Sequence, residues 1–230
     1  MITTLYIVRH GESEGNVLGD IFGVDPPLTQ NGIQQARALS LVFDSITLHH
    51  VYSSRLKRTH KTAQIIADKK GLPISLHDGI RERFFGSLEG KTGVYVKKHF
   101  QDAYEVILKA SPNTQLDWKI VDDMESLREV LKRVLNFFDQ ITHTHKGKTI
   151  LLASHANVML SLLIHLKFAS FNELPYGSIK NTAYIKIEKN DNVYSITETL
   201  GITKKVNAHY DTVGRGLSLR AKHSIAKQSK

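Results

Sequence analysis

The sequence predicts an α/β fold, a three-layer α/β/α sandwich around a mostly parallel central sheet with a helical insertion over the active site. The first observation is the alternation of short apolar runs with segments of helical periodicity, which parallel strands joined by crossover helices require. The second is size, because 230 residues, of which 41% are hydrophobic, can bury the core of one domain. The third is that polar residues follow the apolar runs, at the strand ends where open α/β sheets bind ligands.

The first half of the chain supplies three strands and two helices. Short apolar runs predict strands over residues 3–8, 50–53 and 74–77. Apolar residues at helical spacing predict helices over residues 31–45 and 56–70. Thr29, which closes a Pro-Pro-Leu-Thr turn, suits the N-cap of the first helix, and Gly71 ends the second.

The second half of the chain begins with the segment that we assign to the insertion, about residues 91–146. Two helical segments, over residues 92–109 and 124–145, flank a polar link that contains a proline. A buried strand over residues 148–153 then runs directly into His155 and a further helix, over 157–167.

The end of the predicted domain reads as a hairpin. Residues 182–189 and 193–199 alternate apolar and polar side chains around an Asn-Asp-Asn turn, which is typical of two antiparallel strands. We therefore expect one domain over residues 1–202 and a basic tail over residues 203–230.

The composition excludes several classes of site. With no cysteine, the chain has no disulfides, no thiolate catalysis and no Cys-based zinc site, and it suits a reducing compartment. No basic region precedes the first apolar run, and a cleaved signal peptide would remove the predicted site, so we expect a cytoplasmic protein. The longest apolar region, residues 150–166, is interrupted by Ser154, His155 and Asn157, which indicates a buried strand and helix and no membrane span.

The net charge of +9 is concentrated in the tail. Residues 203–230 hold seven Lys and Arg against Asp211 alone, so six of the nine net positive charges lie there. Such a tail either binds an anionic partner, covers an anionic substrate, or is a solvated terminus. Tyr210 is its only aromatic residue, so we expect no nucleic-acid partner.

Four predicted strand ends carry polar residues suited to one reaction. Because the carboxyl ends of parallel strands meet at one edge of a sheet, these side chains converge in a single pocket. They offer a nucleophile, cations and a proton donor, which are the demands of phosphoryl transfer. Gly11 would let the backbone approach an anion closely. The residues concerned are Arg9, His10, Arg58, Glu82 and His155.

The ordered series of motifs resembles the histidine phosphatase superfamily, also called the phosphoglycerate mutase-like family, and favours its phosphatase branch. The resemblance spans nearly all of residues 3–200 and is highly specific because each motif has the expected strand or helix context. The motifs are Arg9-His10-Gly11-Glu12 with Asn16, residues 23–29, Gly32 with Gln35-Ala36, Ser53-Ser54 with Leu56 and Arg58 through Thr62-Ala63, Glu82 with Gly86 and Glu89-Gly90, and Ser154-His155.

The resemblance implies a mechanism and a role for each site residue. His10 attacks phosphorus in line and forms a phosphohistidine, while neighbouring arginines keep it nucleophilic. Glu82 protonates the departing oxygen and then deprotonates the attacking water. Catalysis on this scheme needs neither metal nor cofactor, because protein groups hold the phosphoryl oxygens. The implied phosphate-binding residues are Arg9, Asn16, Gly23, Arg58 and His155.

Two departures from the family pattern bear on specificity more than on chemistry. The family commonly has Gly after the second His, whereas this chain has Ala156-Asn157. Ser53-Ser54-Arg55 replaces the family's usual Ser-Pro or Ser-Asp step.

The sequence favours a phosphatase over a mutase. The glycolytic mutases carry a Trp soon after the first Asn-containing motif and a Trp-Arg-Arg segment in the insertion, to grip a carboxylate. The only Trp here is Trp118, which Lys119-Ile120 follows, and the insertion offers Lys97-Lys98 instead. We expect a small-molecule phosphoester substrate.

Three alternatives stay open. One is a mutase-type phosphotransferase, another is a module that binds phosphorylated ligands without turning them over, and the third is nucleic-acid binding through the tail. The sequence leaves the oligomeric state open, with a homodimer among the possibilities. The remaining histidines show no shared metal-ligand spacing, and His143 and His145 would point apart on a helix, so we assign them no role.

Overall fold

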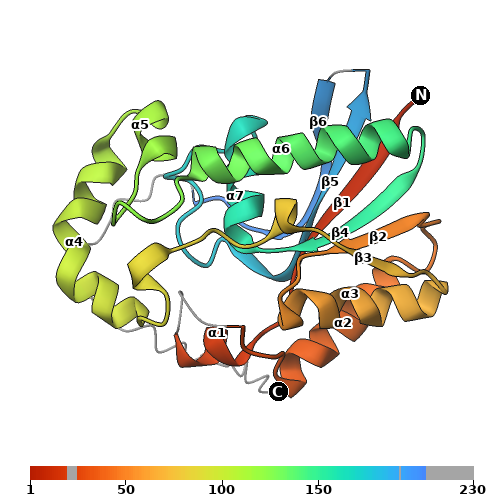
Figure 1. Cartoon of the computed structure of the whole chain (residues 1–230), viewed down its shortest axis with the longest axis horizontal. Coiled ribbons are helices and arrows are strands. Elements are labelled where there is room, and N and C mark those ends of the chain that lie inside the picture. Colours follow the sequence, from red (N-terminus) through yellow and green to blue (C-terminus); the bar gives the residue numbers. More distant parts are fainter. Residues whose placement is uncertain (20–24, 192, 206–230) are drawn as a thin grey trace, which may run out of the picture.

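The computed structural model describes residues 1–19, 25–191 and 193–205. Its elements form three layers around one six-stranded sheet (Figure 1). The strands are β1 (Thr3–Arg9), β2 (His50–Ser53), β3 (Ile74–Leu76), β4 (Thr149–Ser154), β5 (Ile179–Asn190) and β6 (Val193–Ile202). The α-helices are α1 (Glu14–Leu18), α2 (Gln30–Val42), α3 (Lys57–Lys70), α4 (Gly93–Lys109), α5 (Pro112–Asp117), α6 (Leu127–Thr144) and α7 (Ala156–His165), and two 3₁₀ turns are η1 (Asp78–Ile80) and η2 (Gly86–Leu88).

The sheet is mostly parallel, as the sequence predicted. Its strand order is β3-β2-β4-β1-β5-β6. β1, β2, β3 and β4 pair in parallel, whereas β5 and β6 form the expected antiparallel hairpin and add to the edge at β1. The predicted caps are also present, since Thr29 caps α2 through its side chain and Gly71 ends α3 in the left-handed conformation.

Both faces of the sheet are covered, which explains why its central strands are apolar on consecutive residues. Successive side chains of a strand point to opposite faces. Leu5 and Ile7 therefore join a core cluster with α6 and α7, while Tyr6 and Val8 join a second cluster with α2 and α3. The order of layers is α2 and α3, sheet, α6 and α7, which confirms the α/β/α sandwich (Figure 1).

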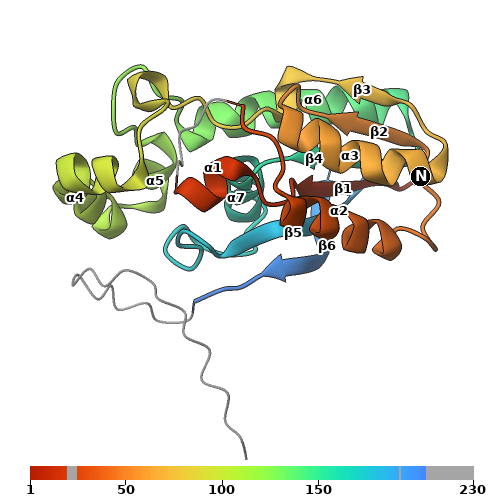
Figure 2. The same ribbon diagram turned by 90° about the horizontal axis from the view of Figure 1, so that it is seen from below.

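The segment over residues 91–146 divides into two parts. α6 packs in the sandwich layer beside α7, where its apolar face enters the main core. α4 and α5 stand beyond one end of the sheet in both ribbon views (Figures 1 and 2). They close on a small core cluster of their own, made of Phe85, Leu88 and Met124.

Two short helices were not expected from the sequence. α1 has only five residues, and α5 lies inside the polar link that we read as irregular. Local capping explains both, because Ser13 forms a capping box with Asn16, and Ser111 caps a helix with proline in its first turn. Hydrophobic periodicity does not detect helices of one or two turns.

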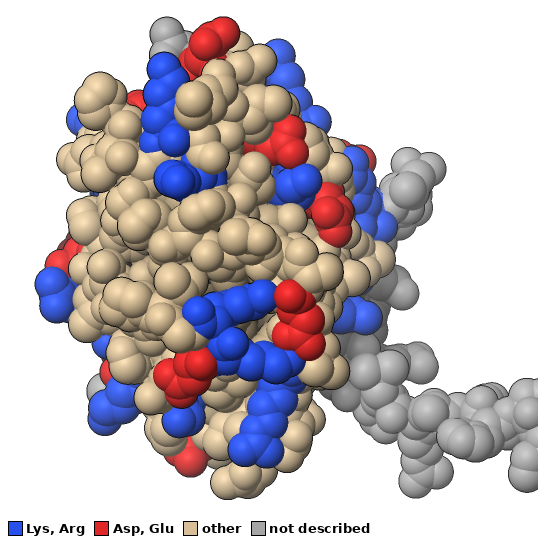
Figure 3. All heavy atoms as spheres, turned by 90° about the vertical axis from the view of Figure 1, so that its right-hand side faces the viewer, with Lys and Arg blue, Asp and Glu red and all other residues tan. Residues whose placement is uncertain are grey.

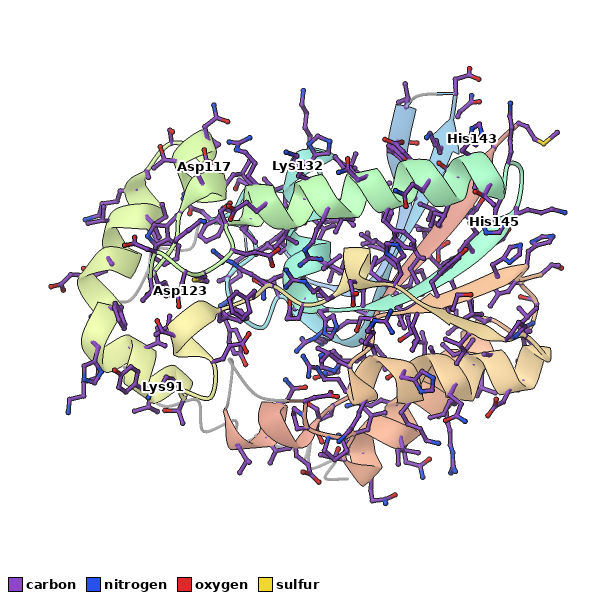
Figure 4. The ribbon with its side chains drawn as sticks, viewed as in Figure 1. Lys91, Asp117, Asp123, Lys132, His143 and His145 are labelled. Atoms are coloured by element: carbon purple, nitrogen blue, oxygen red, sulfur yellow. The ribbon has the colours of Figure 1, made fainter. Side chains whose placement is uncertain are left out.

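The opposite end of the molecule carries mixed charge. Figure 3 shows that Lys and Arg side chains on that face lie beside Asp and Glu side chains. The labelled His143 and His145 lie at the end of α6 that is far from α4 and α5 (Figure 4), and His145 contacts the Tyr52 hydroxyl at 2.8 Å. Of the predicted tail, residues 206–230 lie outside the described residues. Within the part of the chain that the structure describes, no helix is long and apolar enough to cross a membrane.

Candidate active site

The four predicted strand ends meet in one cavity of about 320 Å³. His10 follows β1, Arg58 lies in the first turn of α3 after β2, and Glu82 follows β3 and η1. His155 follows β4 and lies beside His10, with the centroids of the two rings 5.3 Å apart. The structure thus brings together all four residues, which come from four separate parts of the chain.

His10 is held in the tautomer that a nucleophile needs. Its ring is buried, and Nδ1 lies 2.7 Å from the carbonyl oxygen of Gly11. A carbonyl oxygen only accepts, so Nδ1 carries the proton and donates it. The neutral ring therefore has its lone pair on Nε2, the atom that must attack phosphorus.

The charges around His10 keep it neutral. Burial lowers the pKa of His10 well below its usual value, and the positive charges of Arg58 and Arg9 lower it further. Arg9 donates through Nη1 to the carbonyl of Ile179, while its buried Nε finds no hydrogen-bond partner among the described residues. A buried N–H without a partner is costly, and an anion at the cavity floor would satisfy it.

Asp25 orients Arg58. One Asp25 carboxylate oxygen lies 3.8 Å from Nη1 of Arg58, and both oxygens accept from the backbone N–H of Lys57 at 2.7 and 2.9 Å. The carboxylate therefore fixes the start of α3 and the guanidinium one residue later. Asp25 lies in the motif over residues 23–29, but nothing in the sequence pattern marks this role.

His155 is oriented by a chain of hydroxyl groups. Its Nε2 lies 2.8 Å from Ser54 Oγ, which lies 2.6 Å from Thr59 Oγ1, and Thr59 donates to the Leu56 carbonyl at 2.7 Å. The Leu56 carbonyl only accepts, so Thr59 donates to it and Ser54 donates to Thr59. Nε2–H of His155 therefore donates to Ser54. Nδ1 then faces the guanidinium of Arg58, 3.5 Å away.

Burial lowers the pKa of His155 well below its usual value, and the nearby charges of Arg58 and His10 lower it further. His155 is fully buried and does not line the cavity, so its contact with a phosphoryl oxygen stays a prediction from the sequence.

Asn16 lines the cavity, and its amide is fixed by a residue that the sequence analysis missed. Asn16 Oδ1 accepts from the backbone N–H of Ser13 at 3.1 Å and from Nδ2 of Asn181 at 3.0 Å. With its oxygen so engaged, the Asn16 side chain has its NH₂ group left for a phosphoryl oxygen. Asn181 Nδ2 also donates to the carbonyl of His10 at 3.1 Å. No local motif marks Asn181, because its partners are 165 and 171 residues away.

Glu82 is positioned through its backbone. Arg133 donates to the Glu82 carbonyl at 3.1 Å and Arg81 donates to it at 3.2 Å. Both arginines also pair with Glu125, at 2.9 Å each. The Glu82 carboxylate accepts from the backbone N–H of Arg83 at 2.8 Å and lies on the cavity wall. Arg81 pairs with Glu125 and not with its neighbour Glu82.

Gly11 is also required by the packing of the backbone. A Cβ at Gly11 would lie 2.4 Å from the carbonyl oxygen of Gly32, and a Cβ at Gly32 would lie 2.0 Å from that of Glu12. Both glycines are therefore required where the loop after β1 meets the start of α2, and the approach of an anion to Gly11 stays a prediction. Gly23, the remaining predicted phosphate-binding residue, lies outside the described residues.

Within the described residues, no three His, Asp or Glu side chains lie close enough together to hold a metal ion. The positive charges at the cavity floor come from Arg9 and Arg58. The arrangement can thus bind a phosphoryl group with guanidinium groups, attack it with an imidazole, and exchange a proton through a carboxyl group.

Comparisons with known proteins identify the family of the chain. A model of the histidine phosphatase superfamily (branch 1) matches residues 5–199. Putative phosphoserine phosphatase 2 of Hydrogenobacter thermophilus is 31% identical over 198 residues, with 77% of this chain and 92% of that protein covered. The 2,3-bisphosphoglycerate-dependent phosphoglycerate mutase of Streptococcus gordonii is 29% identical over 229 residues, with 87% and 96% covered. The solved structure of Bacillus stearothermophilus YhfR superimposes with a TM-score of 0.73 at 28% identity, over 84% of this chain and 95% of that one. Since the matched residues include every strand that carries the site, the chain belongs to the histidine phosphatase superfamily.

Proposed function

We propose that this protein is a phosphomonoester hydrolase that acts through a phosphohistidine intermediate, without a metal ion, on a small phosphorylated metabolite. The observation that carries the proposal is the state of His10. Its proton lies on Nδ1, its Nε2 lone pair is free, and two guanidinium groups flank it. This is a nucleophile with an anion-binding site beside it.

The reaction has two steps. In the first, Nε2 of His10 forms a bond to phosphorus while the bond from phosphorus to the alcohol oxygen breaks, and Glu82 gives that oxygen a proton. In the second, Glu82 takes a proton from water, the water oxygen bonds to phosphorus, and the phosphorus–nitrogen bond breaks to release phosphate. Arg9, Arg58 and the amide of Asn16 hold the three equatorial oxygens, whose charge rises at each transition state.

A phosphoglycerate mutase-type phosphotransferase is the rival, because relatives of both kinds match the chain. Trp118, the single tryptophan, lines the cavity, and its backbone carbonyl accepts from Arg83 at 2.9 Å. The cytoplasmic location, the small-molecule partner and the oligomeric state stay predictions.

The test is turnover of p-nitrophenyl phosphate in the presence of a chelator, in the native chain and in His10→Ala. We expect turnover in the native chain and a loss of about 10³-fold or more in the variant. His143→Ala, an exposed histidine at the far end of α6, is the matched control and should leave the rate unchanged. Rapid quenching at alkaline pH should trap labelled phosphate on the native chain only.

Full activity of His10→Ala would contradict the proposal. If the native chain turns over no monoester, transfer between 2,3-bisphosphoglycerate and 3-phosphoglycerate distinguishes a mutase from a module that only binds.

A further inference from the structure

The cavity has two chemically different ends. The floor is polar, with Arg9, His10, Asn16, Arg58 and Glu82 around the position of a phosphoryl group. The part farther from the strands is a chamber of apolar side chains, which we call the apolar chamber. Its walls include Phe85, Val96, Ile120, Leu160, Phe171 and Leu174.

The apolar chamber is built from well-packed parts of the fold. Phe85 is 6% exposed and belongs, with Leu88 and Met124, to the small core that supports α4. Val96 and Ile120 pack against that core from α4 and from the loop after α5. Leu160 comes from α7, and Leu174, 5% exposed, comes from the segment that follows α7. Three separate parts of the chain thus present apolar surface to the apolar chamber. Because these side chains pack in the protein core, they keep their positions when a substrate binds.

The apolar chamber has one charged side chain among the described residues that line it, Arg83. Its Nε donates to the carbonyl of Glu125 at 2.5 Å and its Nη2 to the carbonyl of Trp118 at 2.9 Å. Its charge also faces Glu82 and Glu125, although burial still lowers its pKa to about 10. Arg83 therefore joins the walls of the chamber together, and two of its donors are committed to backbone.

A carboxylate in such a space would lose its hydration, and the one cation among the described residues there, Arg83, already faces the carboxylates of Glu82 and Glu125. The labelled Lys91, Asp117 and Asp123 lie on and around the insertion in Figure 4, and none of them lines the cavity. An apolar group, by contrast, gains free energy on entering the chamber in proportion to the surface it buries.

We infer that the substrate is a phosphomonoester of an apolar, ring-bearing alcohol, in which the phosphate lies on the polar floor and the ring fills the apolar chamber. This rests on the proposed function and names its substrate class. It separates the chain from relatives whose names refer to phosphoserine or phosphoglycerate, because both of those carry a carboxylate beside the phosphate. The cavity of about 320 Å³ has room for such an alcohol.

The experiment compares alkyl phosphates that have leaving groups of similar basicity, so that rate differences report on recognition and not on bond strength. The series is ethyl, hexyl and 2-phenylethyl phosphate, with phosphoserine and 3-phosphoglycerate as carboxylate-bearing members. We expect kcat/KM to rise at least tenfold from ethyl to 2-phenylethyl phosphate. Phosphoserine and 3-phosphoglycerate should be no better than ethyl phosphate.

A charge placed in the chamber should weaken this preference. Val96→Lys adds a cation to a half-buried chamber position, and Val94→Lys adds the same cation on the same helix at a position that is 78% exposed and outside the cavity. Val96→Lys should lower the ratio of kcat/KM for 2-phenylethyl phosphate over phosphoserine by about tenfold. Val94→Lys should leave that ratio unchanged. Leu160→Asn, with exposed Leu41→Asn as its control, tests the opposite wall.

The two proposals fail in different ways. If p-nitrophenyl phosphate is hydrolysed through His10 but phosphoserine or 3-phosphoglycerate exceeds 2-phenylethyl phosphate, the substrate class is wrong and the proposed function stands. If no monoester is hydrolysed, calorimetric binding of 3-phenylpropylphosphonate against propylphosphonate still decides the inference. Equal affinities would overturn it, and at least tenfold tighter binding of the phenyl compound would support it.

Discussion

At the scale of single residues, the site depends on side chains that never touch the substrate. Ser54 orients His155, Asp25 orients Arg58, and Asn181 orients Asn16. A fixed orientation matters because a donor helps a transition state only if it needs no rearrangement when charge develops. The residues that bind phosphate are recognisable in the sequence because they sit in local motifs. Asn181 is not, since only the folded sheet brings β5 beside the loop after β1.

Replacement of Asn181 by Ala tests this positioning role. The Asn16 amide loses the donor that fixes its oxygen, and the His10 carbonyl loses a hydrogen bond. We expect kcat/KM for p-nitrophenyl phosphate to fall about tenfold, the order expected from the loss of these hydrogen bonds. Asn190→Ala, at the exposed end of the same strand, serves as the control and should keep the native rate. A normal rate in Asn181→Ala would mean that Asn16 needs no such support, and lower stability with an unchanged rate would show a merely structural role.

At the scale of elements, the loop that carries Glu82 is held by α6. Arg133 of α6 donates to the carbonyls of Gly79 and Glu82, and Glu125 accepts from Arg133, Arg81 and the backbone of Phe84. Burial by itself would raise the pKa of Glu125, but these hydrogen bonds outweigh it and the pKa is lowered. The sequence predicted the helix and the loop but not this attachment, because neither Arg133 nor Glu125 belongs to a motif.

Glu125→Gln should weaken the attachment of that loop. The side chain is 15% exposed, and the variant leaves two guanidinium groups without their carboxylate. We expect the free energy of unfolding to fall by about 2 kcal/mol and kcat to fall more than KM rises, since Glu82 acts in the chemical step. Asp117→Asn breaks the exposed ion pair with Arg128 and should change neither quantity measurably. Chemical denaturation and steady-state kinetics check both variants, and equal behaviour of the two would refute the assigned role.

At the scale of the whole molecule, the fold keeps two histidines neutral inside a basic site. Composition and periodicity were enough to predict the layers, the parallel sheet and the edge at which the site lies. They did not predict that α6 belongs to the sandwich while α4 and α5 stand apart, because a helix's apolar face does not reveal which surface it covers. The apolar chamber likewise escaped the sequence, since Phe85 lies 75 residues before Leu160 and 86 residues before Phe171, and only the fold brings them to one cavity.

The neutral histidines make stability depend on pH. Their pKa is lowered in the folded state, whereas in the unfolded chain each binds a proton near pH 6.5. Below about pH 6.5 the unfolded chain therefore holds more protons, and the free energy of unfolding should fall as pH falls, by up to about 1.4 kcal/mol per pH unit for each histidine. Denaturant titrations between about pH 5.5 and 7.5 measure this slope.

The variant that isolates the effect is His10→Gln with His155→Gln, which should show a smaller slope than the native chain. His143→Gln, an exposed position, should keep the native slope. An unchanged slope in the double variant would assign the pH dependence to other groups.

The backbone contact between Gly11 and Gly32 has a mechanical consequence. Where two backbones touch with no side chain between them, neither can slide without the other, so the loop that carries the nucleophile and the first turn of α2 move as one body. The catalytic imidazole is then anchored to the sheet through β1 and braced from outside by a helix of 13 residues. Loosening it requires lifting that helix from the sheet, which exposes a core cluster to water.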